Sequence, residues 1–122
     1  MPAHPSRADR GLVLAIALTA LTTILIAYGT LAPPGTVESG LPLTDKHLHA
    51  LAFLALVLPL GWVRPNWALG IGAAALAFGG AIELIQPMVG RTAEWGDFVA
   101  DGVGCLLGLI PGQIRRLWTA QR

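Results

Sequence analysis

The sequence predicts an all-α membrane protein, a polytopic bundle of four transmembrane helices. Of its 122 residues, 54% are hydrophobic and only 12% are charged, whereas a soluble domain usually has about 25% charged residues. The apolar residues are grouped in blocks and do not follow the period of an amphipathic helix or strand. At 1.5 Å per residue the first block is about 31 Å long, enough to cross a hydrocarbon core of roughly 30 Å.

The first predicted span, residues 11–31, contains no charged side chain and follows a polar tail, residues 1–10. A cleaved signal peptide is the rival interpretation, because the tail is basic and residues 27–29 (Ala-Tyr-Gly) are loosely like a cleavage site. The apolar run is longer than the roughly 7–15 residues of a signal peptide, and this favours a retained helix.

The second predicted span, residues 45–63, follows a loop rich in proline, glycine and serine at residues 32–43. We expect Thr44 to cap this helix, because its hydroxyl can accept a backbone N–H of the first turn. Asp45 lies in that turn, where its charge complements the helix dipole. Pro59 should kink the inner half of the helix.

The third predicted span, residues 67–86, is crowded with glycine and alanine. Small residues let helix backbones approach closely in lipid, so we expect this helix at the centre of the bundle. Asn66 is expected to cap its start. Pro87 disfavours helical backbone at the residue before it and marks the end of the span.

The fourth predicted span, residues 97–112, carries Gly104 and Gly108 at a spacing typical of close helix packing. A basic tail, residues 113–122, follows it. The single cysteine, Cys105, cannot form an intramolecular disulfide and is interpreted as a small packing residue. The small-residue faces of the third and fourth spans suit packing within the chain or between copies, so the sequence leaves a homo-oligomer open.

The basic residues predict the orientation of the spans. An even number of spans puts both termini on one side, with six of the eight basic residues: Arg7, Arg10, Arg64, Arg115, Arg116 and Arg122. Lys46 and Arg91 fall on the other side. By the positive-inside rule both termini are therefore cytoplasmic. A net charge of +1, without a basic platform carrying aromatic residues, argues against nucleic acid as a partner.

This orientation brings polar residues from three separate stretches to the outer level of the membrane. The candidate site residues are Asp45, Lys46, His49, Glu83, Gln86, Arg91, Asp97 and Asp101. Glu83 and Asp101 are the most informative, because an ionised side chain inside a span is costly unless it is paired. Lys46 and Arg91 are the outer-face cations that could pair with them, and Glu94 is interpreted as a solvated loop charge. A purely structural ion-pair network is the alternative to a functional site.

These motifs resemble the VanZ-like family of small bacterial membrane proteins. The resemblance rests on Asp45-Lys46-x-x-His49, Gly79-x-x-x-Glu83-x-x-Gln86, Arg91, Asp97 and Ala100-Asp101-x-x-Gly104-x-x-x-Gly108. It covers residues 45–108 and implies an integral protein of the bacterial cell envelope, in the cytoplasmic (inner) membrane. The chain departs from the family pattern at Ala50, Phe53 and Asp101, where the family usually has an aromatic residue, often has tyrosine, and usually has asparagine, respectively.

Three functions fit these residues. In the first, a binding module, Arg91 pairs with a phosphate or carboxylate of a lipid headgroup or cell-wall precursor, while Gln86 and the carboxylates accept from hydroxyls or amides. The second is an intramembrane enzyme for a lipid-linked substrate, metal-dependent in one version, because the site contains histidine and carboxylates suited to acid–base or metal chemistry. The third, a proton or ion path, is least favoured because the inner halves of the spans lack ionisable residues.

The sequence assigns neither a metal nor a cofactor to this site. The spacing of His49 and the carboxylates does not form a zinc signature such as HExxH, and no serine or cysteine nucleophile is evident. Membrane lipids are the partners that four apolar spans require.

Overall fold

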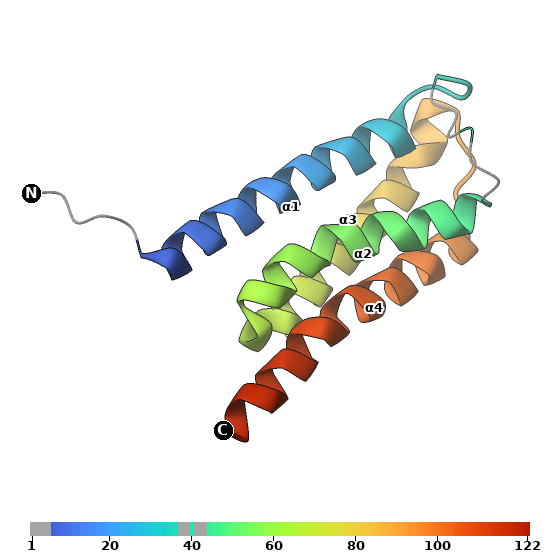
Figure 1. Cartoon of the computed structure of the whole chain (residues 1–122). Helices are drawn as coiled ribbons and strands as arrows, with labels where there is room; N and C mark the ends of the chain where they lie inside the picture. The colour runs from blue at the N-terminus through green and yellow to red at the C-terminus, as the bar shows by residue number, and fades with distance from the viewer. Residues whose placement is uncertain (1–5, 37–39, 41–43) are drawn as a thin grey trace, which may run out of the picture.

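In the part of the chain that the structure describes, four long helices form one bundle. The computed structural model describes residues 6–36, 40 and 44–122. Its elements are α1 (Arg7–Leu31), α2 (Asp45–Val63), η1 (Pro65–Trp67), α3 (Ala68–Ile85), η2 (Gln86–Val89) and α4 (Trp95–Ala120), where η denotes a short 3-10 helix (Figure 1). Residues 1–5 of the predicted tail and residues 37–39 and 41–43 of the predicted loop lie outside the described residues.

All four helical segments are long and apolar enough to cross a membrane, which confirms the prediction of a polytopic, all-α membrane protein. Large apolar side chains face outward on every helix; Leu14, Leu51, Leu69 and Leu106 are between 52% and 88% exposed. Apolar surface on this scale is unfavourable in water, whereas lipid chains solvate it.

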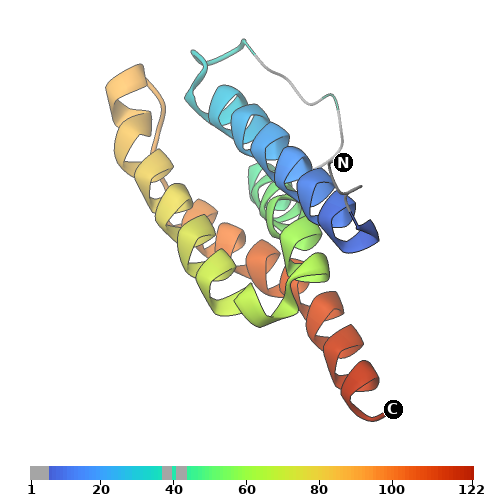
Figure 2. The same cartoon turned by 90° about the vertical axis from the view of Figure 1, so that its left-hand side faces the viewer.

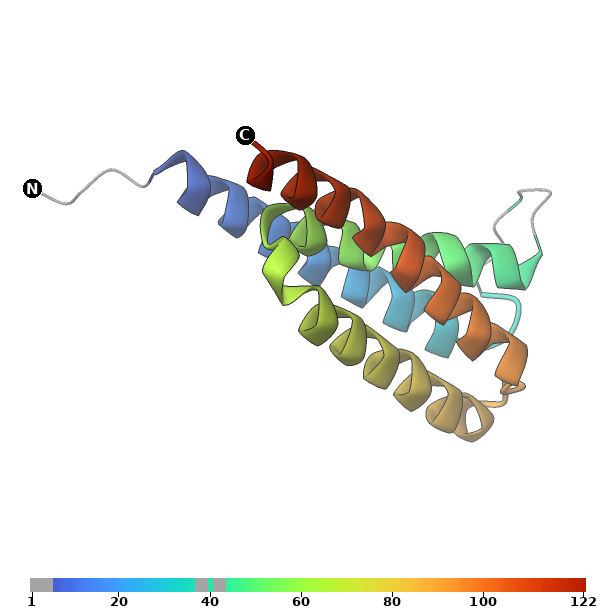
Figure 3. The same ribbon diagram turned by 90° about the horizontal axis from the view of Figure 1, so that it is seen from below.

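The two ends of the bundle carry different parts of the chain. The start of α1, the α2–α3 turn and the end of α4 lie at one end, here called the tail end (Figure 1). The end of α1, the start of α2, η2 and the start of α4 lie at the opposite end, here called the loop end (Figure 3). Tryptophans occur at both ends, as in the aromatic belts of membrane proteins: Trp62, Trp67 and Trp118 at the tail end, and Trp95 at the loop end.

Two capping boxes fix where α1 and α2 begin. The Thr44 hydroxyl accepts the backbone N–H of His47, so the predicted cap is confirmed. Ser6 and Asp9 form the second box, and it starts α1 four residues before the predicted boundary at residue 11. The cap predicted at Asn66 is wrong, because that residue lies inside η1 and α3 starts without a side-chain cap.

The helix that contains the fourth predicted span extends beyond residue 112, where that span was expected to end. α4 continues through Pro111 to Ala120, so most of the expected basic tail is helical. Two contacts hold this extension against the α2–α3 turn. Gln113 Nε2 donates to the Pro65 carbonyl at 2.7 Å, and the Arg115 guanidinium donates to the Trp62 carbonyl and lies over its ring.

The closest helix pair is α2 and α4, which run alongside each other in Figure 3. A Cβ atom on Gly104 or Gly112 would overlap the carbonyl oxygen of Ala50 or Gly61, respectively. A Cβ on Gly108 would lie 2.7 Å from the Leu54 oxygen, so all three glycines are needed for this approach. We call these contacts the α2–α4 seam.

The expectation that the third helix lies at the centre of the bundle is wrong. α1 packs chiefly on α2, and α3 packs chiefly on α4 (Figure 2). Gly70 of α3 faces open space, and a Cβ on Gly72 would reach Leu109 only at 3.4 Å. The small residues of α3 are therefore not all packing residues. Phe53 and Val57 of α2 are fully buried, which places the core at α2.

Candidate functional site

The polar side chains expected on one face gather at the loop end, where they come from α2, α3, η2 and α4. Six of them form a connected group, which we call the polar cluster: Lys46, His49, Glu83, Glu94, Asp97 and Asp101. All of the described side chains that are both polar and buried, namely His49, Gln86, Asp97 and Asp101, lie at this end. The described core therefore has no chain of buried ionisable groups leading to the tail end.

The innermost contact of the cluster joins His49 of α2 to Asp101 of α4. His49 Nδ1 lies 2.8 Å from Asp101 Oδ1, and the two side chains are 7% and 1% exposed. The expectation that Asp101 pairs with Lys46 or Arg91 is therefore wrong. Which basic side chain Asp101 contacts depends on how α2 is rotated about its axis relative to α4, since His49 and Asp101 both face the α2–α4 seam.

The second oxygen of Asp101 points toward α3. Asp101 Oδ2 has no hydrogen-bond partner among the described residues. A Cβ atom built on Gly79 would lie 2.7 Å from this oxygen and 3.2 Å from the Phe53 ring. Gly79 is thus the residue of α3 that leaves space for the carboxylate, one turn before Glu83.

Lys46 bridges two carboxylates at the start of α4. Its ammonium lies 2.8 Å from Glu94 Oε2 and 3.3 Å from Asp97 Oδ1. Its aliphatic stem lies against Gly96, where a Cβ would come within 2.5 Å of Lys46 Cε. The hydrogen bond and charge of Lys46 lower the pKa of the Glu94 carboxyl. Asp97 is 3% exposed and lies 3.9 Å from His49 Nε2 through its other oxygen.

Glu94 has a larger structural role than a solvated loop charge. Its backbone N–H donates to Glu83 Oε2 at 2.9 Å, so it connects α3 with the start of α4. Glu83 therefore has a backbone donor as its partner, and the expected pairing with Lys46 or Arg91 is wrong for this residue too. Glu83 Oε1 is buried and has no partner in the part of the chain described. The position of Glu94 immediately before α4 is the sequence signal that could have indicated this structural role.

Gln86 of η2 and Arg91 of the loop that follows it attach this part of the chain to the end of α1. Gln86 Nε2 donates to the Thr30 carbonyl at 3.3 Å, and an Arg91 N–H donates to the Ala32 carbonyl at 3.1 Å. Gly90 has φ 77°, a left-handed conformation that favours glycine, and it turns the chain so that Arg91 follows η2 closely. The sequence did not predict that the end of α1 supplies hydrogen-bond acceptors here, because every residue has a backbone carbonyl.

Two cavities meet beside Glu94. The polar pocket, of about 260 Å³, is lined by Pro34, Asp45, Gln86, Gly90, Arg91, Thr92, Glu94 and Asp97. The apolar cleft, of about 560 Å³, is lined by Ala77, Gly80, Ala81, Glu83, Leu84, Ala93, Glu94, Trp95 and Phe98. The structure therefore assigns the eight predicted residues to two neighbouring places. Asp45, Gln86 and Arg91 line the polar pocket, and the others belong to the polar cluster, with Asp97 in both.

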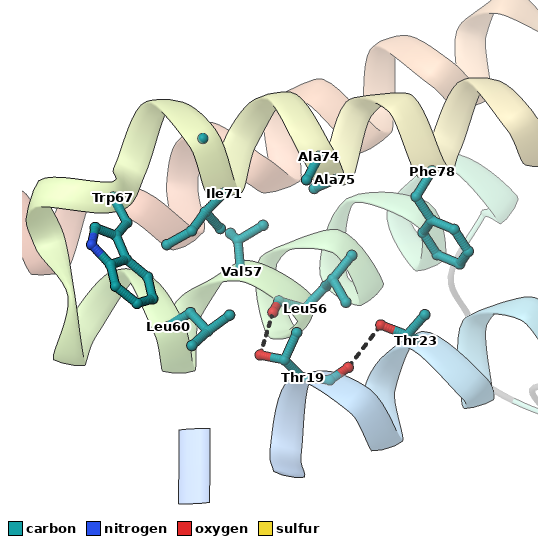
Figure 4. Close-up of a pocket in the computed structure, with 11 residues that line it drawn as sticks. Thr19, Thr23, Leu56, Val57, Leu60, Trp67, Ile71, Ala74, Ala75 and Phe78 are labelled. Atoms are coloured by element: carbon teal, nitrogen blue, oxygen red, sulfur yellow. Dashed lines mark hydrogen bonds between the residues drawn. The ribbon is translucent and has the colours of Figure 1, made fainter. Parts of the chain in front are cut away.

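A separate groove of about 570 Å³ lies between α1, α2 and α3, away from the polar cluster (Figure 4). Its lining is apolar apart from two threonines. The Thr19 hydroxyl donates to the Leu56 carbonyl at 3.3 Å, and the Thr23 hydroxyl donates to the Thr19 carbonyl at 2.8 Å. Both hydroxyls are thus engaged with the backbone, and the groove offers no polar recognition group comparable to those at the loop end.

No family model, curated protein or solved structure matches the chain. The case for a function therefore depends on the geometry of the loop end.

Proposed function

We propose that this chain is a VanZ-like integral membrane protein of the bacterial cell envelope that binds an anionic, hydroxyl-bearing amphiphile at its loop end. The ligand class is an envelope-lipid headgroup or a lipid-linked cell-wall precursor. One observation carries the proposal. The polar pocket and the apolar cleft share Glu94 as a wall, so a headgroup and the first part of its chain fit side by side.

Arg91 is the group suited to the anionic part of the ligand. Among the described residues it has no carboxylate within 4 Å, and its hydrogen bond to the Ala32 carbonyl uses only part of its five-donor guanidinium. Lys46, in contrast, is already engaged by Glu94 and Asp97. A phosphate at Arg91 would receive charge-assisted, bidentate hydrogen bonds.

Apart from the Thr92 hydroxyl, the free polar side-chain groups of the pocket are acceptors. Asp45, Glu94 and Asp97 supply carboxylate oxygens, and Gln86 Oε1 is buried without a donor among the residues described. A simple anion would be repelled by three carboxylates around one arginine. A headgroup with hydroxyl or amide donors next to its phosphate satisfies both sets of partners.

The proposed location is the cytoplasmic membrane, with both termini in the cytoplasm. Arg7, Arg10 and Arg64 belong to the tail end, as do Arg115 and Arg116 in the last part of α4 and Arg122 just after it. Lys46 and Arg91 belong to the loop end. The positive-inside rule then directs the polar pocket outward, toward the compartment in which cell-wall precursors are used.

Native mass spectrometry of the protein purified in mild detergent tests this function. We expect the wild type to carry an adduct when it is incubated with phosphatidylglycerol, whose glycerol headgroup has hydroxyls beside the phosphate, and a much weaker adduct with phosphatidylcholine, which has none. Arg91→Gln should lower the bound fraction about tenfold or more, because a hydrogen bond to a charged group contributes roughly 1.5–3 kcal/mol.

The matched control is Arg64→Gln, which removes the same charge at the tail end, where Arg64 lies over the Trp67 ring. If Arg64→Gln and Arg91→Gln lowered the bound fraction equally, binding would be general attraction of anionic lipids to a basic protein. The proposed pocket would then be rejected.

An intramembrane enzyme is the second candidate, and the His49–Asp101 pair favours it. A carboxylate 2.8 Å from one imidazole nitrogen orients a histidine as a general base. The same spectra distinguish the two functions. A binding module releases the phosphatidylglycerol at its original mass, whereas an enzyme that uses His49 to activate water for hydrolysis of a phosphate ester releases the two hydrolysis products in the wild type but not in His49→Gln.

A further inference from the structure

The polar cluster contains more negative charge than its own basic residues offset. The cluster holds four carboxylates, those of Glu83, Glu94, Asp97 and Asp101, and two basic side chains, Lys46 and His49. Glu83 joins it through the backbone N–H of Glu94, and the other three carboxylates contact Lys46 or His49. Even when His49 is protonated, two negative charges remain in excess. Because Asp97 and Asp101 are 3% and 1% exposed, water stabilises these two charges poorly, and protons or a further cation compensate for them.

Three side chains converge on one point from three different helices. One ligand-type atom from each of His49 (α2), Glu83 (α3) and Asp101 (α4) lies within 4.8 Å of the other two. His49 Nδ1 and Asp101 Oδ1 are 2.8 Å apart. Two ligand atoms that are each about 2.1 Å from a metal ion lie about 3 to 3.4 Å apart, so a small outward rotation would admit an ion between them.

Two buried oxygens at this point lack a donor. Asp101 Oδ2 and Glu83 Oε1 have no hydrogen-bond partner among the described residues. The Asp101 side chain is almost wholly buried, and its Oδ2 is aimed at α3 at the level of Gly79, one turn before Glu83. A buried carboxylate oxygen without a donor is costly, and coordination to a cation is one of the few ways to compensate for it.

A second triad shares His49 and is less suitable. Asp45, His49 and Asp97 also have ligand atoms within 4.8 Å of one another. However, Asp45 is exposed, and Asp97 is already engaged by Lys46 at 3.3 Å. A metal ion there would have to compete with an ammonium group for the same carboxylate.

We propose that His49, Glu83 and Asp101 bind one divalent transition-metal ion, beneath the polar pocket and independently of any lipid. One imidazole nitrogen and two carboxylates form a mixed donor set suited to Zn²⁺ or Mn²⁺. The ion would offset the two excess charges and connect α2, α3 and α4 at the loop end.

Metal retention by the full-length protein in detergent tests the site. Protein treated with chelator is equilibrated with buffered Zn²⁺ or Mn²⁺, desalted, and measured by inductively coupled plasma mass spectrometry. We expect about one equivalent in the wild type. His49→Ala and Glu83→Gln should each weaken retention by at least about tenfold, as expected when a metal site loses a ligand.

Asp45→Asn and Glu94→Gln are the matched controls, because each removes one carboxylate from the same end of the bundle, changes none of the three proposed ligands and keeps the Glu94 backbone N–H that donates to Glu83. Both should retain the metal. Equal losses in Asp45→Asn and Glu83→Gln would move the ion to the other triad and overturn the proposal. Stoichiometry in His49→Ala equal to that of the wild type would mean adventitious binding and would also overturn it. If His49→Ala does not give a monodisperse protein, the nearly isosteric Glu83→Gln decides.

Discussion

Glu94 carries two contacts that position the start of α4. Its carboxylate pairs with Lys46 of α2 at 2.8 Å, and its backbone N–H donates to Glu83 of α3 at 2.9 Å. Only the first contact depends on the charge of the side chain. A substitution that keeps the backbone but removes the charge therefore separates the two.

The first prediction concerns pH. Lys46 lowers the pKa of Glu94 in the folded protein below its ordinary value of 4.5. The unfolded chain then binds more protons near that pH, so the contribution of the pair is fully present above pH 4.5 and is lost as the pH falls through the lowered pKa. Thermal unfolding of detergent-solubilised protein should show that Glu94→Gln loses less Tm than the wild type between about pH 5 and pH 3.

The size of this effect is small, because exposed ion pairs are screened by solvent. Lys46→Met should abolish the difference between the two proteins, since it removes the partner that causes the shift. Parallel Tm curves for wild type and Glu94→Gln over the whole pH range would contradict the assignment.

Side-chain partners in the cluster were harder to predict than the presence of polar residues at the loop end. The spacing of Asp97 and Asp101 by four residues predicts that they share a face of a helix, and both are buried. The pairing of Asp101 with His49 depends on the rotation of α2 about its axis, and no residue pattern in α2 specifies that rotation. The contribution of the Thr30 and Ala32 carbonyls depends on backbone atoms, which every residue possesses.

At the scale of the elements, the α2–α4 seam determines how the site is assembled. The glycines that permit close approach occur at every fourth position of α4, at residues 104, 108 and 112, and face the backbone of α2. The same seam brings Asp101 beside His49. A change in the distance between these two helices would therefore also change the distance between the two side chains of the innermost pair.

The second prediction tests this seam. Gly112→Ala places a Cβ atom onto the Gly61 carbonyl oxygen, and we expect it to destabilise the bundle by about 1–3 kcal/mol, as for other overpacked cores. Gly102→Ala is the control on the same helix, because its Cβ would meet only a Leu76 methyl at 3.8 Å. Reversible unfolding in mixed micelles should show a loss for Gly112→Ala and little change for Gly102→Ala.

Comparable losses of stability in the two variants would mean that helix flexibility, and not the α2–α4 seam, determines the effect of these substitutions.

The seam also explains why the sequence misled us about the centre of the bundle. α3 is rich in small residues, but composition alone does not say which of them face another helix. The spacing of Gly104 and Gly108 was the better indicator, because a fixed interval of four keeps small residues on one face.

At the scale of the whole molecule, the length of the apolar stretches determined the fold class. The excess of basic residues at the tail end over the loop end suggests the orientation of the bundle in the membrane. Each span had to be about as long as the membrane is thick, so the number of helices followed directly from the sequence. Helix ends were less certain, because Pro111 does not stop α4 once Gln113 and Arg115 hold the extension against the α2–α3 turn. Which helix lies beside which is a property of side-chain packing, and sequence periodicity does not encode it.

The third prediction concerns the sidedness of the bundle. In a Cys105→Ala background, Thr92→Cys at the loop end and Gln121→Cys at the tail end provide single, exposed thiols, because the native cysteine is the only one and is buried. A membrane-impermeant maleimide added to intact spheroplasts should label Thr92→Cys and leave Gln121→Cys unlabelled until the cells are lysed. This result follows from six basic residues at the tail end and two at the loop end.

Labelling in the opposite sense would have a consequence beyond topology. The polar pocket would then open to the cytoplasm, where its ligand would be a lipid-linked molecule before export and not one in use outside the membrane. Arg91 and the apolar cleft would still select an anionic amphiphile, since those contacts do not depend on direction. The labelling experiment therefore decides which pool of lipids should be used in the adduct measurements, and it should precede them.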